Sequence, residues 1–211
     1  MERFFTIAPQ RALWEQTIKK SDFIVNFARV NNEEEAQAFV EEISKKHYKA
    51  THNVFAYVIG PNDEIKRYSD NGEPSGTAGV PMLEVLQKNH VRNVAAVITR
   101  YFGGIKLGAG GLIRAYAGTT AQGLEAIGMV ERLFQTKVTI NIDYKNNDAL
   151  TYWLKSHDYH ILDTQFDTEV HQIVAVQDEK IKDFEAELRN HFSDNLSFAI
   201  GDPTYLEIPV K

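Results

Sequence analysis

Cysteine is absent from the 211 residues of this chain. Disulfide bonds, thiol catalysis, and zinc or iron–sulfur sites held by cysteine are therefore excluded. Long apolar runs are missing too: no stretch approaches the roughly 20 residues that cross a bilayer, and the opening residues MERFFTIAPQRALWEQ hold no apolar core of a signal peptide. The sequence predicts a cytoplasmic protein without a membrane partner.

A surplus of positive charge is also lacking. The net charge is −6; residues 1–134 carry 16 Lys/Arg against 15 Asp/Glu, and residues 135–211 carry 7 against 14. Non-specific phosphate binding depends on clustered cations. The C-terminal third is therefore a poor candidate for nucleic-acid binding, whereas the first part could hold a local cationic site.

Hydrophobic periodicity and capping residues predict an α+β protein of two domains, residues 1–131 and 132–211. In the first domain we expect strands at 21–30, 53–59, 64–68 and 94–98, and helices at 33–46, 81–88 and 112–127. In the second we expect a strand at 136–143, a helix at 147–157, strands at 159–166 and 169–176, a helix at 179–192 and a strand at 197–208. This β-α-β-β-α-β order is that of the ferredoxin-like split unit.

Glycine is concentrated in one short run. Five of the thirteen glycines lie in RYFGGIKLGAGGLIRAY, between the predicted strand 94–98 and the predicted helix 112–127: Gly103, Gly104, Gly108, Gly110 and Gly111. A glycine-rich turn before a helix start allows backbone N–H groups to face an anion. The run is neither the dinucleotide fingerprint nor the P-loop. Both an anion cradle and tight packing of the helix on the sheet remain open.

Three cations accompany these glycines: Arg100, Lys106 and Arg114. They could bind phosphate, carboxylate or an acidic partner surface. Alternatively, Arg100 pairs inside the fold with Asp70 or Glu73. The aromatic residues Tyr101 and Phe102 could stack on a base or belong to the core.

A polar loop precedes the predicted helix 81–88 and contains Asp70, Glu73, Ser75 and Thr77. A carboxylate beside hydroxyls could act as a base with a nucleophile, but the same residue types form turns and caps. No catalytic residue is assigned from the sequence.

Upstream of this loop, His52 and Asn53 could reach the glycine loops as polar contacts, or cap and pack at the start of a strand. His47 and His52 lack metal-ligand spacing, and no HExxH motif or calcium loop occurs. We therefore expect neither a metal nor a cofactor.

Three segments, KATHNVFAYVIG, SDNGEPSGTAGVPMLEVL and VITRYFGGIKLGAGGLIRAY, resemble the IMPACT/YigZ family. The resemblance covers roughly residues 18–128, with Val54 where many members carry cysteine. It implies a first domain with the α/β sandwich fold shared by a ribosomal protein domain and by galactose/homoserine kinases. It also implies a second, ferredoxin-like domain resembling the last domain of elongation factor G.

The resemblance further implies a link to the regulation of translation. We therefore expect a non-catalytic protein that binds RNA, the ribosome or a translation factor through the face bearing Arg100, Lys106 and Arg114, with His52, Asp70 and Glu73 lining it. The alternative is an enzyme acting on a small anionic or phosphorylated ligand in the same cleft, with Glu73 or Asp70 as the base. A dipeptidase is not supported, because the metal ligands of a metallopeptidase are missing.

Overall fold

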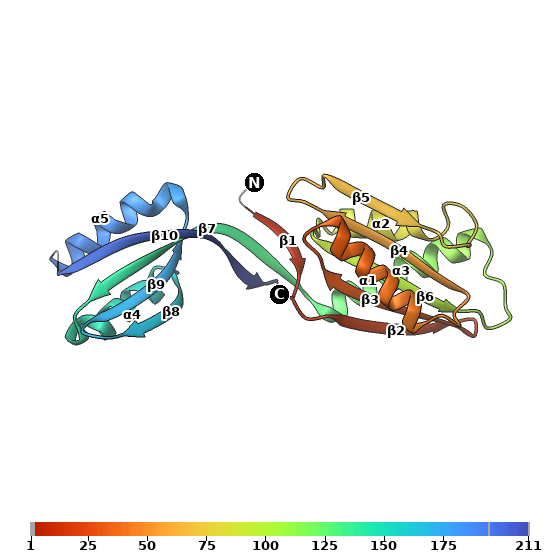
Figure 1. Ribbon diagram of the computed structural model, residues 1–211, viewed down its shortest axis with the longest axis horizontal. Coiled ribbons are helices and arrows are strands. Elements are labelled where there is room, and N and C mark those ends of the chain that lie inside the picture. Colours follow the sequence, from red (N-terminus) through yellow and green to blue (C-terminus); the bar gives the residue numbers. More distant parts are fainter. Residues whose placement is uncertain (1–2, 194, 211) are drawn as a thin grey trace. The chain divides into compact units, whose positions relative to one another are not determined.

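The computed structural model describes residues 3–193 and 195–210, which form two compact units (Figure 1). Unit 1 comprises residues 3–132 together with residues 207–210, and unit 2 comprises residues 133–206. The division between the units falls inside the long strands β7 (Met129–Ile142) and β10 (Leu196–Pro209). Each unit is an α+β arrangement with an antiparallel sheet, as the sequence predicts.

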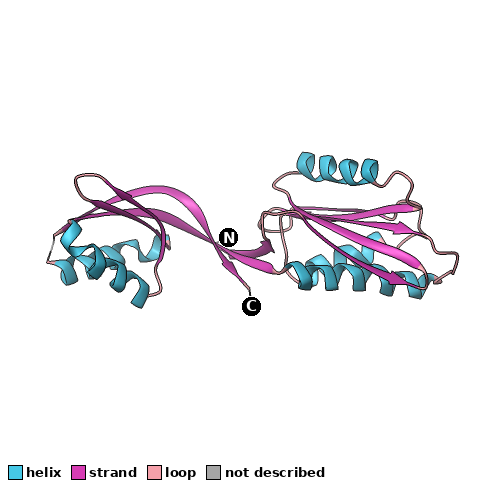
Figure 2. Ribbon diagram, turned by 90° about the horizontal axis from the view of Figure 1, so that it is seen from below, coloured by secondary structure: helices cyan, strands magenta, loops and turns pink. Residues whose placement is uncertain are grey.

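Unit 1 is built on a five-stranded sheet in the order β2-β3-β6-β4-β5, with every neighbouring pair antiparallel. The strands are β2 (Ala12–Ile18), β3 (Ser21–Arg29), β4 (His52–Ile59), β5 (Ile65–Ser69) and β6 (Val94–Tyr101). β6 is central and almost wholly buried, because helices cover both faces of this sheet (Figure 2).

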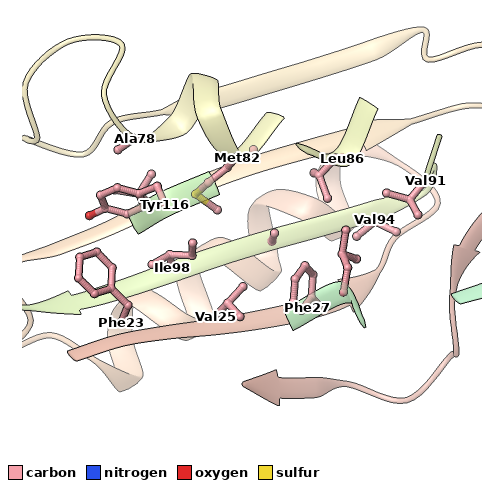
Figure 3. Close-up of a cluster of buried hydrophobic side chains, with 14 of the residues drawn as sticks. Phe23, Val25, Phe27, Ala78, Met82, Leu86, Val91, Val94, Ile98 and Tyr116 are labelled. Atoms are coloured by element: carbon pink, nitrogen blue, oxygen red, sulfur yellow. The ribbon is translucent and has the colours of Figure 1, made fainter. Parts of the chain in front are cut away.

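Helix α1 (Glu33–Lys46) covers one face, and α2 (Gly79–Lys88) and α3 (Ala109–Ile127) cover the other. Asn32 caps the start of α1, because its side chain accepts a hydrogen bond from the Glu35 amide. On the second face, alternate residues of β3, β4 and β6 pack against Met82, Leu86 and Tyr116 (Figure 3).

Unit 2 contains β7, α4 (Asn147–Ser156), β8 (His160–Phe166), β9 (Val170–Val176), α5 (Ile181–Phe192) and β10, with short 3₁₀ turns before each helix at Tyr144–Asn146 and Asp178–Lys180. β10 pairs with β7, which is followed in the sheet by β9 and β8. The β-α-β-β-α-β order matches the one expected from the sequence.

The structure adds two strands to those predicted and shifts the start of several predicted elements. β1 (Arg3–Ile7) and β2 were not predicted, and β7 begins at Met129 rather than at residue 136. α3 begins at Ala109, so Gly110 and Gly111 belong to its first turn and not to the preceding loop.

Candidate functional site

The side chains of β6 alternate between the two faces of the sheet, and this places the cationic residue Arg100 in the core of unit 1. Val94, Ala96 and Ile98 face α2 and α3, and Arg100 continues this inward-facing row. Its side chain is 5% exposed and lies between the rings of Phe23 and Phe102, with its Cζ 5.3 and 5.4 Å from their centroids. A charge at such a depth requires a counter-charge.

Glu73 supplies that counter-charge from the loop before α2. Arg100 Nη1 donates to Glu73 Oε1 at 2.6 Å, and the Tyr116 hydroxyl donates to the same oxygen at 2.7 Å. Burial, followed by the charge of Glu73, raises the pKa of Tyr116 far above its ordinary value, so Tyr116 stays a neutral donor. Of the two alternatives for Arg100, the structure contains the internal ion pair.

His52 lies beside this pair, directly across from Arg100 in the β4–β6 register. Its Nδ1 is 2.8 Å from the carbonyl oxygen of Asn71, which can only accept, so Nδ1 carries a proton. Its Nε2 is 3.7 Å from Glu73 Oε2. A histidine nitrogen and a buried carboxylate oxygen thus face each other where both border a pocket.

Asn53, the next residue, points to the opposite face of the sheet. It is the register partner of Thr99, whose hydroxyl donates to Asn53 Oδ1 at 2.8 Å. Asn53 therefore does not share the pocket with His52, because consecutive strand residues face opposite sides.

Asp70 holds the start of α2 in place. Its Oδ1 accepts from the amides of Ala78 and Gly79 at 3.1 and 2.8 Å, and its Oδ2 accepts from Gly76 at 2.8 Å. The sequence allowed either a catalytic or a capping role for the residues of this loop. With three backbone amides donating to it, Asp70 has the capping role.

The two hydroxyl residues of the same loop, Ser75 and Thr77, lie outside the pocket beside His52. Thr77 donates to the carbonyl oxygen of Pro74 at 2.6 Å, and Ser75 is exposed. Neither contacts the Glu73 carboxylate.

The larger pocket has a volume of about 410 Å³ and opens beside the start of α3. It is lined by Thr51, His52, Glu73, Pro74, Arg100, Phe102, Lys106, Leu107, Gly108, Ala109 and Leu112. Since Glu73 neutralises Arg100, the cation left to meet a ligand there is Lys106. Gly108 has φ +72° and precedes α3 without any side-chain cap.

A second pocket of about 270 Å³ adjoins the first and shares Leu107 with it. It is lined by Ile18, Lys19, Leu107, Gly111, Arg114 and Ala115. Arg114 thus lies in a different pocket from Lys106, and Gly103, Gly104 and Gly110 line neither. Lys19 was not among the predicted site residues, because a lysine in a hairpin turn carries no motif.

Gly103 is required by packing rather than by a ligand. A Cβ at this position would lie 1.7 Å from the carbonyl oxygen of Lys20, so only glycine allows the loop to approach the β2–β3 turn so closely. Its amide donates to Ser21 Oγ at 3.2 Å. For Gly103, the tight-packing alternative has a direct geometric basis.

The described residues contain no group of three or more His, Asp or Glu side chains arranged to hold a metal ion. Among the helices of residues 3–193 and 195–210, none has the length and apolar character needed to span a membrane.

The Impact N-terminal domain profile matches residues 19–124, which include both glycine loops and every residue that lines the larger pocket. YvyE, an IMPACT family member of Bacillus subtilis, is 43% identical across 100% of this chain and 97% of its own length. The chain belongs to the IMPACT family. Residues 140–195 match a domain of unknown function, DUF1949.

Two further relatives carry the IMPACT name, and one solved structure resembles almost the whole chain. The Escherichia coli family member YigZ is 37% identical, over 82% of this chain and 86% of its own. A Dictyostelium discoideum IMPACT homolog is 44% identical, but over only 44% of this chain and 27% of its own. A crystal structure of a hypothetical protein superposes with a TM-score of 0.61 at 34% identity, covering 96% of this chain and 98% of that one.

Proposed function

We propose that this IMPACT family member is a non-catalytic cytoplasmic protein of translation or its regulation, which contacts RNA phosphates through Lys106 and Arg114. The proposal includes the finer relationships that the family resemblance implies: unit 1 to a ribosomal protein domain and unit 2 to the last domain of elongation factor G. A ribosomal surface would then be contacted through its RNA.

The observation that carries the proposal is that two cationic side chains, Lys106 and Arg114, are exposed and have no carboxylate partner among the described residues. Lys106 and Arg114 are exposed, border adjoining pockets, and form no salt bridge within residues 3–193 and 195–210. Arg100, by contrast, is neutralised by Glu73. Unpaired cations beside a helix start attract phosphate oxygens.

The experiment measures binding of the purified protein to ribosomal subunits and to free structured RNA at about 50 and 200 mM salt, a range over which phosphate contacts weaken strongly. The variant Lys106→Ala/Arg114→Ala is compared with Lys155→Ala/Lys182→Ala, which removes two exposed helix lysines of unit 2. We expect saturable binding that falls with salt and is lost only in the first variant. Absence of binding at the lower salt concentration would overturn the proposal.

Arg100 is left unchanged in this test. Its removal would leave Glu73 as an uncompensated buried carboxylate, so lost binding could reflect lost folding.

One observation favours a second function, an enzyme acting on a small anionic ligand. His52 Nε2 and Glu73 Oε2 are 3.7 Å apart in a pocket whose volume suits a small molecule. Glu73 is then the base, since the oxygens of Asp70 already accept three amides. A thermal-shift screen of phosphorylated compounds tests this: stabilisation that varies little with salt and disappears in His52→Gln supports the enzyme.

A further inference from the structure

A pair of lysines forms the tip of the β2–β3 hairpin. Ile18 pairs with Ser21 in the strand register, so Lys19 and Lys20 are the whole of the turn. Both are exposed and have positive φ, 46° and 64°. Such turns favour Asn-Gly, because a left-handed conformation costs other residues with a side chain about 1 kcal/mol. Turn chemistry therefore does not account for two lysines here.

The turn is part of the same surface as the glycine loop. The carbonyl oxygen of Lys20 occupies the space that a Cβ on Gly103 would fill. The next residue, Ser21, accepts the Gly103 amide at 3.2 Å. The lysine pair is therefore fixed against the segment that leads to Lys106.

Lys19 also lines the smaller pocket together with Arg114, and Leu107 separates this pocket from the one that contains Lys106. No salt bridge within the described ranges involves Lys19 or Lys20. Asp22, two residues after Lys20, accepts a hydrogen bond from Thr17 at 2.7 Å, and Glu73 pairs with Arg100. Cationic groups thus border two adjoining pockets.

We propose that Lys19 and Lys20 complete a binding surface for a single-stranded RNA, whose backbone crosses Leu107 and places phosphates at both pockets. A single phosphate would engage one pocket, whereas a strand engages both. Phe102 is 44% exposed at the rim of the larger pocket and offers a ring on which a base can stack. This inference rests on the proposed function and extends it to a ligand class and to two further residues.

The test uses a fluorescently labelled single-stranded RNA of about ten nucleotides, within the site sizes of single-strand binders, and anisotropy titrations between about 50 and 200 mM salt. The key variant is Lys19→Asn/Lys20→Gly, which removes both charges and installs the residue pair that this turn prefers. Its fold should be at least as stable as that of the parent protein, and thermal unfolding checks this. Lys155→Ala/Lys182→Ala is the charge-matched control.

For the turn variant we expect an RNA affinity about tenfold or more lower at about 100 mM salt, and a slope of log K against log salt shallower by about 1.4, or about 0.7 for each lost contact. The control should match the parent protein. Inorganic phosphate should compete poorly with the RNA, because it fills one pocket at a time.

If the turn variant binds the RNA like the parent protein while Lys106→Ala/Arg114→Ala loses binding, this inference is overturned and the proposed function stands. If no protein binds RNA at the lowest salt concentration, both are overturned. Inorganic phosphate and unlabelled RNA are also compared at the same total phosphate concentration. If they compete equally well, the inference that one strand occupies both pockets is overturned.

Discussion

Arg100 Nη1 donates a 2.6 Å hydrogen bond to Glu73 Oε1, and the two side chains are only 5% and 4% exposed. The pair joins the end of β6 to the loop before α2, and Tyr116 ties it to α3 through the same carboxylate oxygen. Three segments that border the larger pocket are thus held by one buried carboxylate. Replacing either charged partner should therefore lower the free energy of unfolding.

Glu73→Gln is expected to lower the free energy of unfolding by about 3–5 kcal/mol, because Arg100 is left as an unpaired buried charge. Urea denaturation followed by circular dichroism measures this loss. Glu41→Gln is the control: Glu41 pairs with Lys45 on the exposed face of α1, and its replacement should change the free energy of unfolding far less than Glu73→Gln does. Equal effects of the two substitutions would show that the buried pair does not stabilise the fold.

Two glycines of the same run should respond oppositely to alanine. Gly103→Ala places a Cβ 1.7 Å from the Lys20 carbonyl oxygen and must displace the loop or the turn. We expect a loss of about 2 kcal/mol or more, in the range of severe overpacking. Gly110→Ala meets only Arg114 Nη1, at 3.6 Å, inside a helix, and should be neutral or stabilising by up to about 1 kcal/mol. Thermal unfolding of both variants decides this, and a destabilised Gly110→Ala would contradict the packing argument.

Much of unit 1 follows from periodicity in the sequence. In the structure the inward-facing row of Val94, Ala96 and Ile98 continues to Arg100, and the internal ion pair is one of the two interpretations that the sequence allowed. The Asn32 cap and the first turn of α1 follow from local residue types. The cap depends only on neighbours in sequence, which is why the sequence alone indicates it.

The pocket itself could not be derived in this way. The partner of Arg100 could be either Asp70 or Glu73 by sequence, and the choice depends on how the loop before α2 folds, with Asp70 turned to the amides of Gly76, Ala78 and Gly79. Tyr116 and Lys19 join this region only because α3 and the β2–β3 turn pack against the loop after β6. These contacts link residues that no local pattern relates.

Asp70→Ala should destabilise unit 1 by about 1–3 kcal/mol, since three backbone amides lose their acceptor. Chemical denaturation gives the magnitude. Asp70→Asn retains one side-chain oxygen and should lose less. Ser75→Ala in the same loop is the control, because Ser75 is exposed and should change stability by less than about 0.5 kcal/mol. If Asp70→Ala unfolds like Ser75→Ala, the start of α2 does not depend on this carboxylate.

His47 gives unit 1 a pH-sensitive position at the end of α1. Burial, followed by the charge of Lys46, holds the pKa of His47 below its ordinary value of 6.5. Nδ1 lies 3.0 Å from the Tyr101 hydroxyl, and Nε2 is buried with no hydrogen-bond partner among the described residues. In the charged imidazolium both ring nitrogens carry protons, and the Nε2 proton would have no acceptor among the described residues.

The consequence for stability follows from which state binds the proton more readily. Because the pKa of His47 is lower in the folded state, the unfolded chain gains the proton first as the pH falls through about 6.5, and the protein loses stability there. We expect His47→Gln, which keeps a polar group at this position, to show a smaller loss between about pH 7 and 5.5 than the parent protein. Urea denaturation across this pH range measures the difference. An NMR titration of the seven histidines, with the His47 signal assigned by its absence from the variant, provides the direct check. A desolvated imidazole whose added proton has no acceptor must favour its neutral form. The prediction is therefore contradicted by a His47 pKa at or above 6.5, or by the same dependence of unfolding free energy on pH in the two proteins.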